Sequence, residues 1–258
     1  MRVILLGDFT GRPGEGMKNI SMTIRDMLSI KHDVLALNSR ELIDQAFFRK
    51  IRLLRPEIIH YTHGPTIRSL IILKIAKYIS GRKPKSIISA TRPYFSKYSR
   101  WALPFVKPDL VLTQSEKFES FFKEKGCRFK FFANGVDCNK FVPPSKSEKI
   151  HLREYFGLPN NKKIALHVGH IKGNRDLEIF KKIQKLPGIQ VVIVGGTTDE
   201  ADEKLKKELA KTGIKVFHRY FEDISRVYKM SDLYVFPVKD SGNKLPISYN
   251  QVGAIDLP

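Results

Sequence analysis

Residues 133–144 read ANGVDCNKFVPP, and this stretch divides the sequence into two similar parts. It contains an Asn-Gly turn and ends in two prolines, which mark the end of regular structure. On both sides of it, short apolar runs alternate with amphipathic segments of helix length. The turn is therefore predicted to close the last strand of one α/β unit and to lead into the linker to the next.

The first part, residues 1–142, is predicted to be one doubly wound α/β domain. Its apolar runs indicate strands at 2–7, 33–37, 57–61, 86–90, 109–113 and 129–133. Helices are expected between them, at 16–30, 41–54, 66–80, 95–105 and 115–125. Nearly continuous hydrophobic strands, each followed by a helix, are typical of a parallel sheet covered on both faces.

The second part, residues 143–258, repeats this alternation after a polar linker at 145–149. Strands are predicted at 163–168, 189–194, 214–217 and 232–236, and helices near 175–185, 199–212 and 222–230. Two such domains facing each other would form a cleft at the carboxyl ends of their strands, where open α/β sheets bind ligands.

Charge is concentrated in one segment of the 258-residue chain. Residues 45–108 contain 14 lysines and arginines and a single acidic residue, Glu57, so they carry +13 of the net +20. Such a segment attracts polyanions, of which nucleic acid, anionic lipid and sugar phosphates are all candidates. No apolar stretch approaches the roughly 18 residues of a membrane span, and the N-terminus does not resemble a signal peptide. A cytoplasmic protein is expected, with Cys127 and Cys138 as reduced, incidental thiols.

Four segments in order resemble glycosyltransferase family 4, whose members are retaining enzymes of the two-domain GT-B type. They are NGVDCNKF (134–141), HVGHIKGNRDLEIF (167–180), VVIVGG (191–196) and VYKMSDLYVFP (227–237). The resemblance implies two Rossmann-like domains, 1–142 on the acceptor side and 143–258 on the nucleotide-sugar side. It also implies transfer of a hexosyl group from a nucleotide-diphosphate sugar, with retention and without a metal cofactor. The acceptor would be a glycan or a lipid-linked molecule in cell-surface polysaccharide or glycolipid biosynthesis.

The segment after the strand at 163–168 is a candidate diphosphate site. Gly169, His170, Lys172 and Arg175 are predicted to open a helix, which would place two cations near a helix N-terminus. A solvated helix start would look similar. In the family an arginine and a lysine hold the donor diphosphate here, and the resemblance places His170 in the position of the arginine and Arg175 in that of the lysine.

Further donor-site candidates follow from other strand ends. Gly195 ends an apolar strand before a helix expected near Asp199, so its backbone could approach an anion, although a plain strand-to-helix turn is equally compatible. The resemblance adds Gly16, from a glycine-rich loop that is not GxGxxG, and donor contacts at Asn134, Arg219 and Tyr220.

Three departures from the family bear on catalysis. Arg92 stands where the family often has a histidine that contacts the transferred sugar, and it is the candidate catalytic residue. The Glu-x7-Glu signature is missing, because Ile255 or Asp256 falls at the first glutamate and the second would follow Pro258. We therefore expect a truncated second domain and little transferase activity from these residues alone. No DxD, HExxH or paired-cysteine motif indicates a metal site.

The basic segment suggests a membrane-proximal acceptor. Residues 68–80 are largely apolar with two lysines, and residues 95–105 add Tyr98, Trp101 and Phe105 among cations. This mixture suits an interface with anionic lipid, and a peripheral position on the inner face of the cell membrane would follow. A sheet-covering helix is the alternative for 68–80. Two other functions stay open: a non-catalytic glycosyltransferase-like subunit, and a nucleic-acid-binding protein, for which no motif is present, so no nucleic-acid partner is expected.

Overall fold

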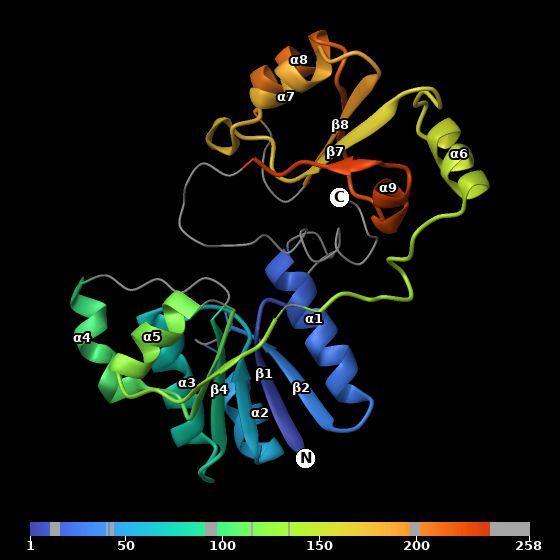
Figure 1. Cartoon of the computed structure of the whole chain (residues 1–258). Coiled ribbons are helices and arrows are strands. Elements are labelled where there is room, and N and C mark those ends of the chain that lie inside the picture. Colours follow the sequence, from blue (N-terminus) through green and yellow to red (C-terminus); the bar gives the residue numbers. More distant parts are fainter. Residues whose placement is uncertain are drawn as a thin grey trace. The chain divides into compact units, whose positions relative to one another are not determined.

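The computed structural model describes residues 1–10, 16–39, 41, 44–90, 97–114, 116–133, 135–196 and 202–237. The chain divides into two compact units, residues 1–134 and 135–258, with the division at the Asn-Gly dipeptide (Figure 1). Each unit is built on a parallel sheet covered by helices, so the predicted α/β class is confirmed. Among the described residues, no helix is both long and apolar enough to cross a bilayer.

In the part of the first unit that the structure describes, the sheet has six parallel strands in the order β2-β1-β3-β4-β5-β6. Their bounds are β1 (Arg2–Gly7), β2 (Asp33–Asn38), β3 (Ile58–Tyr61), β4 (Lys85–Ala90), β5 (Leu110–Thr113) and β6 (Phe129–Phe131). Val3 pairs with Val34 on one side and with Ile58 on the other. Because the chain changes direction across the sheet at β1, the carboxyl ends of β1 and β3 form a topological switch point.

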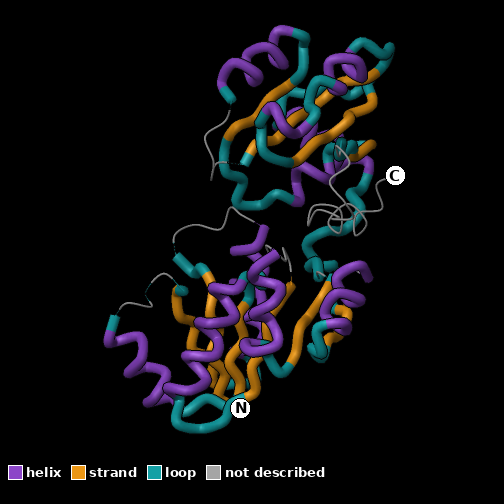
Figure 2. Tube along the Cα trace, turned by 90° about the vertical axis from the view of Figure 1, so that its left-hand side faces the viewer, coloured by secondary structure: helices purple, strands orange, loops and turns teal. Residues whose placement is uncertain are grey.

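The helices that the structure describes around this sheet, drawn in purple in Figure 2, are α1 (Gly16–Ser29), α2 (Gln45–Leu54), α3 (Ile67–Ile79), α4 (Lys97–Val106) and α5 (Glu116–Glu124). One side chain or more from each of α2 to α5 packs into a single core with alternate strand residues, including Phe47, Leu73, Leu103 and Phe122. These four helices therefore cover the same face of the sheet. Local capping sets the helix starts, since Asp44 accepts a hydrogen bond from the Ala46 amide at 2.8 Å, so α2 begins at Gln45 and not at the predicted residue 41.

Within its described residues, 135–196 and 202–237, the second unit has four parallel strands in the order β10-β7-β8-β9. They are β7 (Lys163–Val168), β8 (Ile189–Gly195), β9 (Lys215–His218) and β10 (Leu233–Tyr234). Helices α7 (Ile179–Gln184) and α8 (Glu203–Lys211) pack on one face. On the other face lie α6 (Lys146–Tyr155) and α9 (Ser225–Lys229), so this sheet is covered on both sides.

Helix α6 corrects the predicted polar linker at 145–149. Ser145 is its N-cap, and the Ser145 hydroxyl accepts a hydrogen bond from the Glu148 amide at 3.1 Å. Leu152 and the C-cap residue Phe156 are buried in the core of the unit. A serine followed three residues later by glutamate is a helix-start signal. The sequence therefore indicates a helix here, although the polar composition of residues 145–149 suggested a linker.

An aspartate fastens the amino edge of the first sheet. Asp109, directly before β5, accepts hydrogen bonds from the amide and the hydroxyl of Ser86, at 2.7 and 2.6 Å. The ammonium group of Lys77, on α3, lies 2.6 Å from the same oxygen. Burial would raise the pKa of Asp109, but the hydrogen bonds from Lys77 and Ser86 lower this pKa to about 2. The carboxylate thus joins the starts of β4 and β5 to a helix.

Asp232 does the same for the second sheet. It precedes β10 and accepts a hydrogen bond from the Ile164 amide of β7 at 2.7 Å. Two cations of α6 pair with it: Lys149, at 2.8 Å, and Arg153, whose side chain is buried and also donates to the Met230 carbonyl at 3.0 Å. Burial acts to raise the pKa of Asp232, but the hydrogen bond and charge of Lys149, the Ile164 amide and the Arg153 charge hold it below its usual value.

Candidate functional site

The carboxyl edge of the second sheet is the candidate binding site. Because β7, β8, β9 and β10 are parallel, the segments that follow them emerge at one edge. Gly169 and Arg219 lie in these segments, and Gly195 is the last residue of β8. The strand order places β8 and β10 on opposite sides of β7, so the switch point of this unit lies beside Gly169.

Gly169 leaves β7 in close contact with a buried histidine. Its amide donates to the Val194 carbonyl at 3.0 Å, and a Cβ at this position would lie 2.8 Å from Nε2 of His167. Any larger residue would therefore displace the imidazole or the backbone. A glycine keeps the backbone of this turn uncovered, which is a requirement for close approach of a phosphate group.

His167 is uncharged at neutral pH. Its side chain is 1% exposed, and burial lowers its pKa to about 4, with a smaller contribution from the positive charge of Arg175. Nδ1 lies 3.0 Å from the Val235 carbonyl oxygen, which can only accept, so Nδ1 carries the proton. The histidine thus joins the ends of β7 and β10 without adding charge to the edge.

Lys172 and Arg175 do not lie at the start of an α-helix, which corrects the predicted helix at 175–185. Lys172 precedes a single 3₁₀ turn, Gly173–Arg175, and Asp176 then adopts a left-handed backbone with φ of 53°. Helix α7 begins only at Ile179 and has six residues. The helix-dipole argument for a diphosphate site therefore fails, and what stays is the charge of two half-buried cations beside the end of β7.

Gly195 is closely packed within the unit. A Cβ there would lie 2.7 Å from Cδ1 of Ile171 and 3.1 Å from Cδ2 of His218. The His218 Nε2 atom donates to the Gly196 carbonyl at 3.0 Å. Helix α8 begins at Glu203, with Asp202 as its N-cap, and not near residue 199 as predicted. The glycine therefore lets β8 end in close contact with Ile171 and with His218, the last residue of β9.

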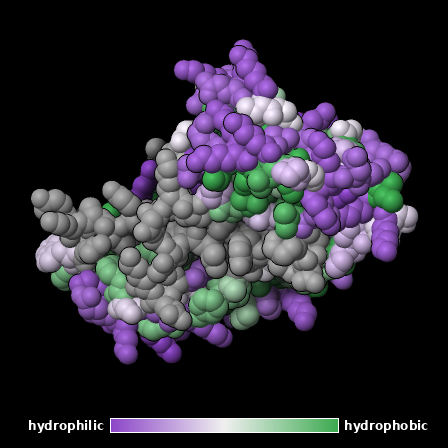
Figure 3. All heavy atoms as spheres, turned by 45° about the horizontal axis from the view of Figure 1, so that its top comes forward, coloured by the Kyte–Doolittle hydropathy of each residue, from purple (hydrophilic) through white to green (hydrophobic). Residues whose placement is uncertain are grey.

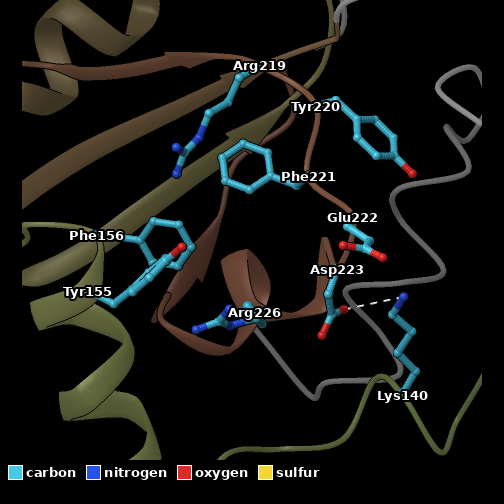
Figure 4. A pocket seen from close by; sticks show the side chains of 9 residues that line it. All are labelled: Lys140, Tyr155, Phe156, Arg219, Tyr220, Phe221, Glu222, Asp223 and Arg226. Atoms are coloured by element: carbon cyan, nitrogen blue, oxygen red, sulfur yellow. Dashed lines mark ion pairs between the residues drawn. The ribbon is translucent and has the colours of Figure 1, made fainter. Parts of the chain in front are cut away.

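Arg219 and Tyr220 follow β9 and line a pocket with a volume of about 500 Å³ (Figure 4). Cation–aromatic contacts shape it: the Arg219 guanidinium lies 4.8 Å from the ring centre of Phe221, and that of Arg226 lies 4.6 Å from the ring centre of Tyr155. Neither arginine has a carboxylate partner among the described residues. The complete lining is Lys140, Tyr155, Phe156, Arg219, Tyr220, Phe221, Glu222, Asp223 and Arg226.

Sequence reasoning missed the α6 side of this pocket. Tyr155 and Phe156 enter it from the C-terminal end of α6, a helix that was not predicted. Arg226 comes from α9, and the Lys140 ammonium group lies 3.3 Å from the Asp223 carboxylate, as the dashed line in Figure 4 marks. The capping signal at Ser145 would have revealed α6, whereas the stacking of arginines on rings from other elements leaves no local signal.

The first unit has a comparable close approach at its switch point. Gly7 ends β1, and a Cβ there would lie 2.5 Å from Oγ1 of Thr62. The buried Thr62 hydroxyl is 2.7 Å from the hydroxyl of Ser21 and 3.1 Å from Nδ1 of His63. Gly16 is the first residue of α1. The other candidates of this unit, Arg92 and Asn134, lie outside the described residues.

Metal-binding groups are scarce in the part of the chain that the structure describes. No three His, Cys, Asp or Glu side chains lie close enough there to hold a metal ion. Cys127 is buried and Cys138 exposed, and both are free thiols.

Comparisons with known proteins agree with this geometry. Residues 148–249 match the family model described as "Glycosyl transferases group 1". The structure of HepE from Anabaena in complex with UDP and glucose is similar, with a TM-score of 0.73 and 17% identity over 100% of this chain and 79% of that chain. A glycosyltransferase from Rickettsia africae gives a TM-score of 0.68 at 14% identity, covering 91% of this chain and 72% of that one.

WaaG, a glycosyltransferase involved in lipopolysaccharide biosynthesis, gives a TM-score of 0.64 at 13% identity over 100% of this chain and 80% of WaaG. No curated protein matches the chain significantly. The fold is α/β with parallel sheets and resembles GT-B glycosyltransferases.

Proposed function

We propose that the protein is a glycosyltransferase that uses a nucleoside-diphosphate sugar as donor. The observation that carries the proposal is the family match at 148–249, which includes the whole carboxyl edge of the second sheet. Lys172 and Arg175 lie at that edge, and the glycine turn at Gly169 is beside them. HepE, which has a similar fold, binds UDP and glucose in its crystal structure, and this supports the same class of donor.

In this proposal, the two cations hold the diphosphate while the bond from the sugar to the diphosphate breaks. Negative charge then accumulates on the leaving diphosphate, and fixed positive groups lower the energy of that transition state. The uncharged His167 positions the turn without competing for the anion. Gly16, Asn134, His170, Gly195, Arg219 and Tyr220 complete the proposed donor contacts, and Arg92 contacts the transferred sugar.

The finer features of the proposal come from the resemblance to family 4. They are transfer of a hexosyl group with retention at the anomeric carbon, no metal cofactor, and a glycan or lipid-linked acceptor in polysaccharide or glycolipid biosynthesis. The enzyme would work in the cytoplasm, at the inner face of the cell membrane.

Binding measurements on charge-reversed protein test the donor site. Lys172→Glu with Arg175→Glu should weaken nucleoside-diphosphate binding by about a hundredfold or more, because each charged hydrogen bond contributes about 1.5–3 kcal/mol. Binding of the matching nucleoside should change little. The control is Lys204→Glu with Lys207→Glu, which reverses two exposed charges on α8. Titration calorimetry with uridine, guanosine and adenosine diphosphates and their nucleosides measures all three proteins.

Equal losses for the diphosphate and the nucleoside would contradict the diphosphate assignment. Turnover of a panel of nucleotide sugars by the full-length gene product tests the activity separately. Tight diphosphate binding together with no transfer or hydrolysis of any donor would favour the non-catalytic subunit over the enzyme.

A further inference from the structure

Three neighbouring helices of the first unit form a basic surface. Helix α2 packs beside α3, and α3 packs beside α4, on the face of the sheet that they share. None of the three contains an acidic residue, and together they carry Arg49, Lys50, Arg52, Arg68, Lys74, Lys77, Lys97 and Arg100. Helix α5, on the same face, contains Glu116, Glu119 and Glu124. On this face of the sheet, α2, α3 and α4 therefore carry only positive charges, whereas α5 carries charges of both signs.

The outer side of α3 and α4 is also apolar. Tyr78 is 88% exposed, Trp101 75% and Phe105 65%, while Ile71 and Ile75 are each exposed by more than 40%. The opposite side of the same helices is buried in the core, through residues such as Leu73 and Leu103. The predicted sheet-covering helix is thus correct for α3, but its inner contacts leave the outer apolar side chains without cover among the described residues.

The apolar side chains of the two helices belong to one surface. Lys74, on the outer side of α3, donates to the Phe105 carbonyl of α4 at 2.8 Å. Phe105 in turn contacts Trp101, with ring centres 5.5 Å apart. On the face that Figure 3 draws, hydrophobic side chains (green) gather in small groups among hydrophilic ones (purple). The exposed aromatic and aliphatic residues of α3 and α4 lie on neighbouring helices, and exposed apolar groups of this kind mark sites of interaction.

We propose that the α2–α4 surface docks on an anionic lipid membrane. Tryptophan and tyrosine favour the interface between headgroups and acyl chains, where the ring is in an apolar region and its polar atom stays wet. Trp101, Phe105 and Tyr78 enter this region, and the surrounding lysines and arginines contact lipid phosphates. Nucleic acid would use the cations but would leave Ile71 and Ile75 exposed, so the lipid surface fits both components.

This inference does not depend on sugar transfer, because α2–α4 belong to the first unit and the proposed diphosphate site to the second. The two proposals can therefore fail independently. A protein that binds membranes but no nucleoside diphosphate would contradict only the donor site.

Trp101 is the single tryptophan of the chain, so its fluorescence reports this surface alone. The experiment adds vesicles of phosphatidylcholine, with and without phosphatidylglycerol, to the unmodified chain. Expected are a blue shift of Trp101 emission and quenching by brominated acyl chains, only when phosphatidylglycerol is present and decreasing with added salt. This measurement needs no variant and so does not depend on the folding of a mutant.

Two variants then separate the charges from the rings. Arg49→Gln, Arg52→Gln and Arg68→Gln together should reduce vesicle binding by about a hundredfold at low salt, since each cation near an anionic surface contributes about fivefold. The matched control removes three exposed lysines of α8 through Lys204→Gln, Lys207→Gln and Lys211→Gln, and should reduce it far less. Phe105→Ser should reduce it about tenfold, because one buried phenyl ring is lost.

Several outcomes would overturn the proposal. One is binding that ignores lipid charge, and another is binding without any change in Trp101 emission. Equal losses in the α8 control and the α2–α4 variant would show a non-specific charge effect. A blue shift that grows with protein concentration without lipid would identify a second copy of the chain as the partner. Duplex DNA that produces the same shift would identify nucleic acid.

Discussion

The two units are built alike at their sheet edges and differ on their outer surfaces. Asp109 and Asp232 each precede a strand, accept the amide of a neighbouring strand and pair with a cation from a helix. The outer surfaces share nothing comparable. On α8, Lys206 pairs with Glu203, and no large hydrophobic residue of this helix is among the exposed ones. On α3, Tyr78 and two isoleucines are exposed.

This contrast shows that two units with similar sheets can carry different residues on the outer sides of their helices. A helix meets the sheet through one side only, so the sheet constrains its inner residues and leaves its outer side free. The outer side of α3 and α4 exposes large apolar side chains, whereas the outer side of α8 exposes charged ones. Substitutions at corresponding positions of the two units test how similar their interiors are.

Loss of the aspartates should give the largest effect. Asp232→Ala leaves the buried Arg153 without its counter-charge, and we expect it to destabilise the second unit by about 3–5 kcal/mol. Asp109→Ala should cost about 1–3 kcal/mol, because Lys77 can turn to solvent and chiefly the hydrogen bonds to Ser86 are lost. Urea unfolding followed by hydrogen exchange, with the Ser86 and Ile164 amides as local probes, measures both. Equal costs would show that the second cation of Asp232 adds nothing.

Acid should destabilise both units through one buried histidine each. Burial lowers the pKa of His60 and of His167 to about 4. The unfolded chain takes up the proton near pH 6.5 and the folded chain does not. Stability is therefore unaffected above pH 6.5 and falls as the pH drops from about 6.5 to about 4. Each histidine should cost about 2 kcal/mol between pH 7 and pH 5.

His167→Phe sharpens this prediction. The ring of His167 already packs against Phe180 and Phe236, with centres 5.2 and 5.4 Å apart, so phenylalanine suits the same space. The variant should lose its share of the pH dependence in the second unit and keep that of His60 in the first. Thermal unfolding at several pH values measures this pH dependence. If the substitution left it unchanged, His167 would take up its proton as readily in the folded protein as in the unfolded chain.

The strand-ending glycines should give a smaller difference between the units. Gly7→Ala places a methyl group against the hydrogen-bonded Thr62 hydroxyl and should cost about 2–3 kcal/mol. Gly195→Ala meets the flexible end of Ile171, which can shift, and should cost about 1–2 kcal/mol. Gly173→Ala is the control, since nothing lies within 4 Å of a Cβ there. If Gly7→Ala lost less stability than Gly195→Ala, the contact with Thr62 would not limit the size of the residue at this position.

Neutralising surface charge should have the smallest effect on stability. On the acid-free α2–α4 surface, Arg49→Gln with Arg52→Gln relieves repulsion and should raise stability by a few tenths of a kcal/mol. Lys206→Gln on α8 removes an exposed ion pair with Glu203 and should lower it by about 0.3–0.5 kcal/mol. Opposite signs in differential scanning calorimetry would confirm the contrast, and equal signs would remove it.

The sheets could be predicted from the sequence because their strands are buried on both faces. Runs such as residues 2–7 and 163–168 are almost wholly apolar, and the structure has strands at these same positions. Helix α6 could not be found in this way, since only a few of its side chains are buried. Its polar sequence resembles a linker unless the capping serine is noticed.

The candidate site was harder to predict than the sheets. The glycines and cations at the strand ends were identified, but the helix expected at Arg175 is interrupted where Asp176 turns left-handed. No residue pattern gave that backbone angle. The pocket beside Arg219 is formed by rings from α6 and by Arg226 of α9, and contacts between elements distant in sequence leave no local pattern.

The two aspartates pair with cations at different distances along the chain, and this difference has a consequence for synthesis on the ribosome. Asp109 needs Lys77, 32 residues earlier, whereas Asp232 needs Arg153, 79 residues earlier. At a synthesis rate of about 5–20 residues per second, about 4–16 s pass between the synthesis of Arg153 on α6 and that of Asp232. During that interval Arg153 has no counter-charge, and the first helix of the second unit is exposed to chaperones and proteases. In the first unit, the corresponding interval between the synthesis of Lys77 and that of Asp109 is less than half as long.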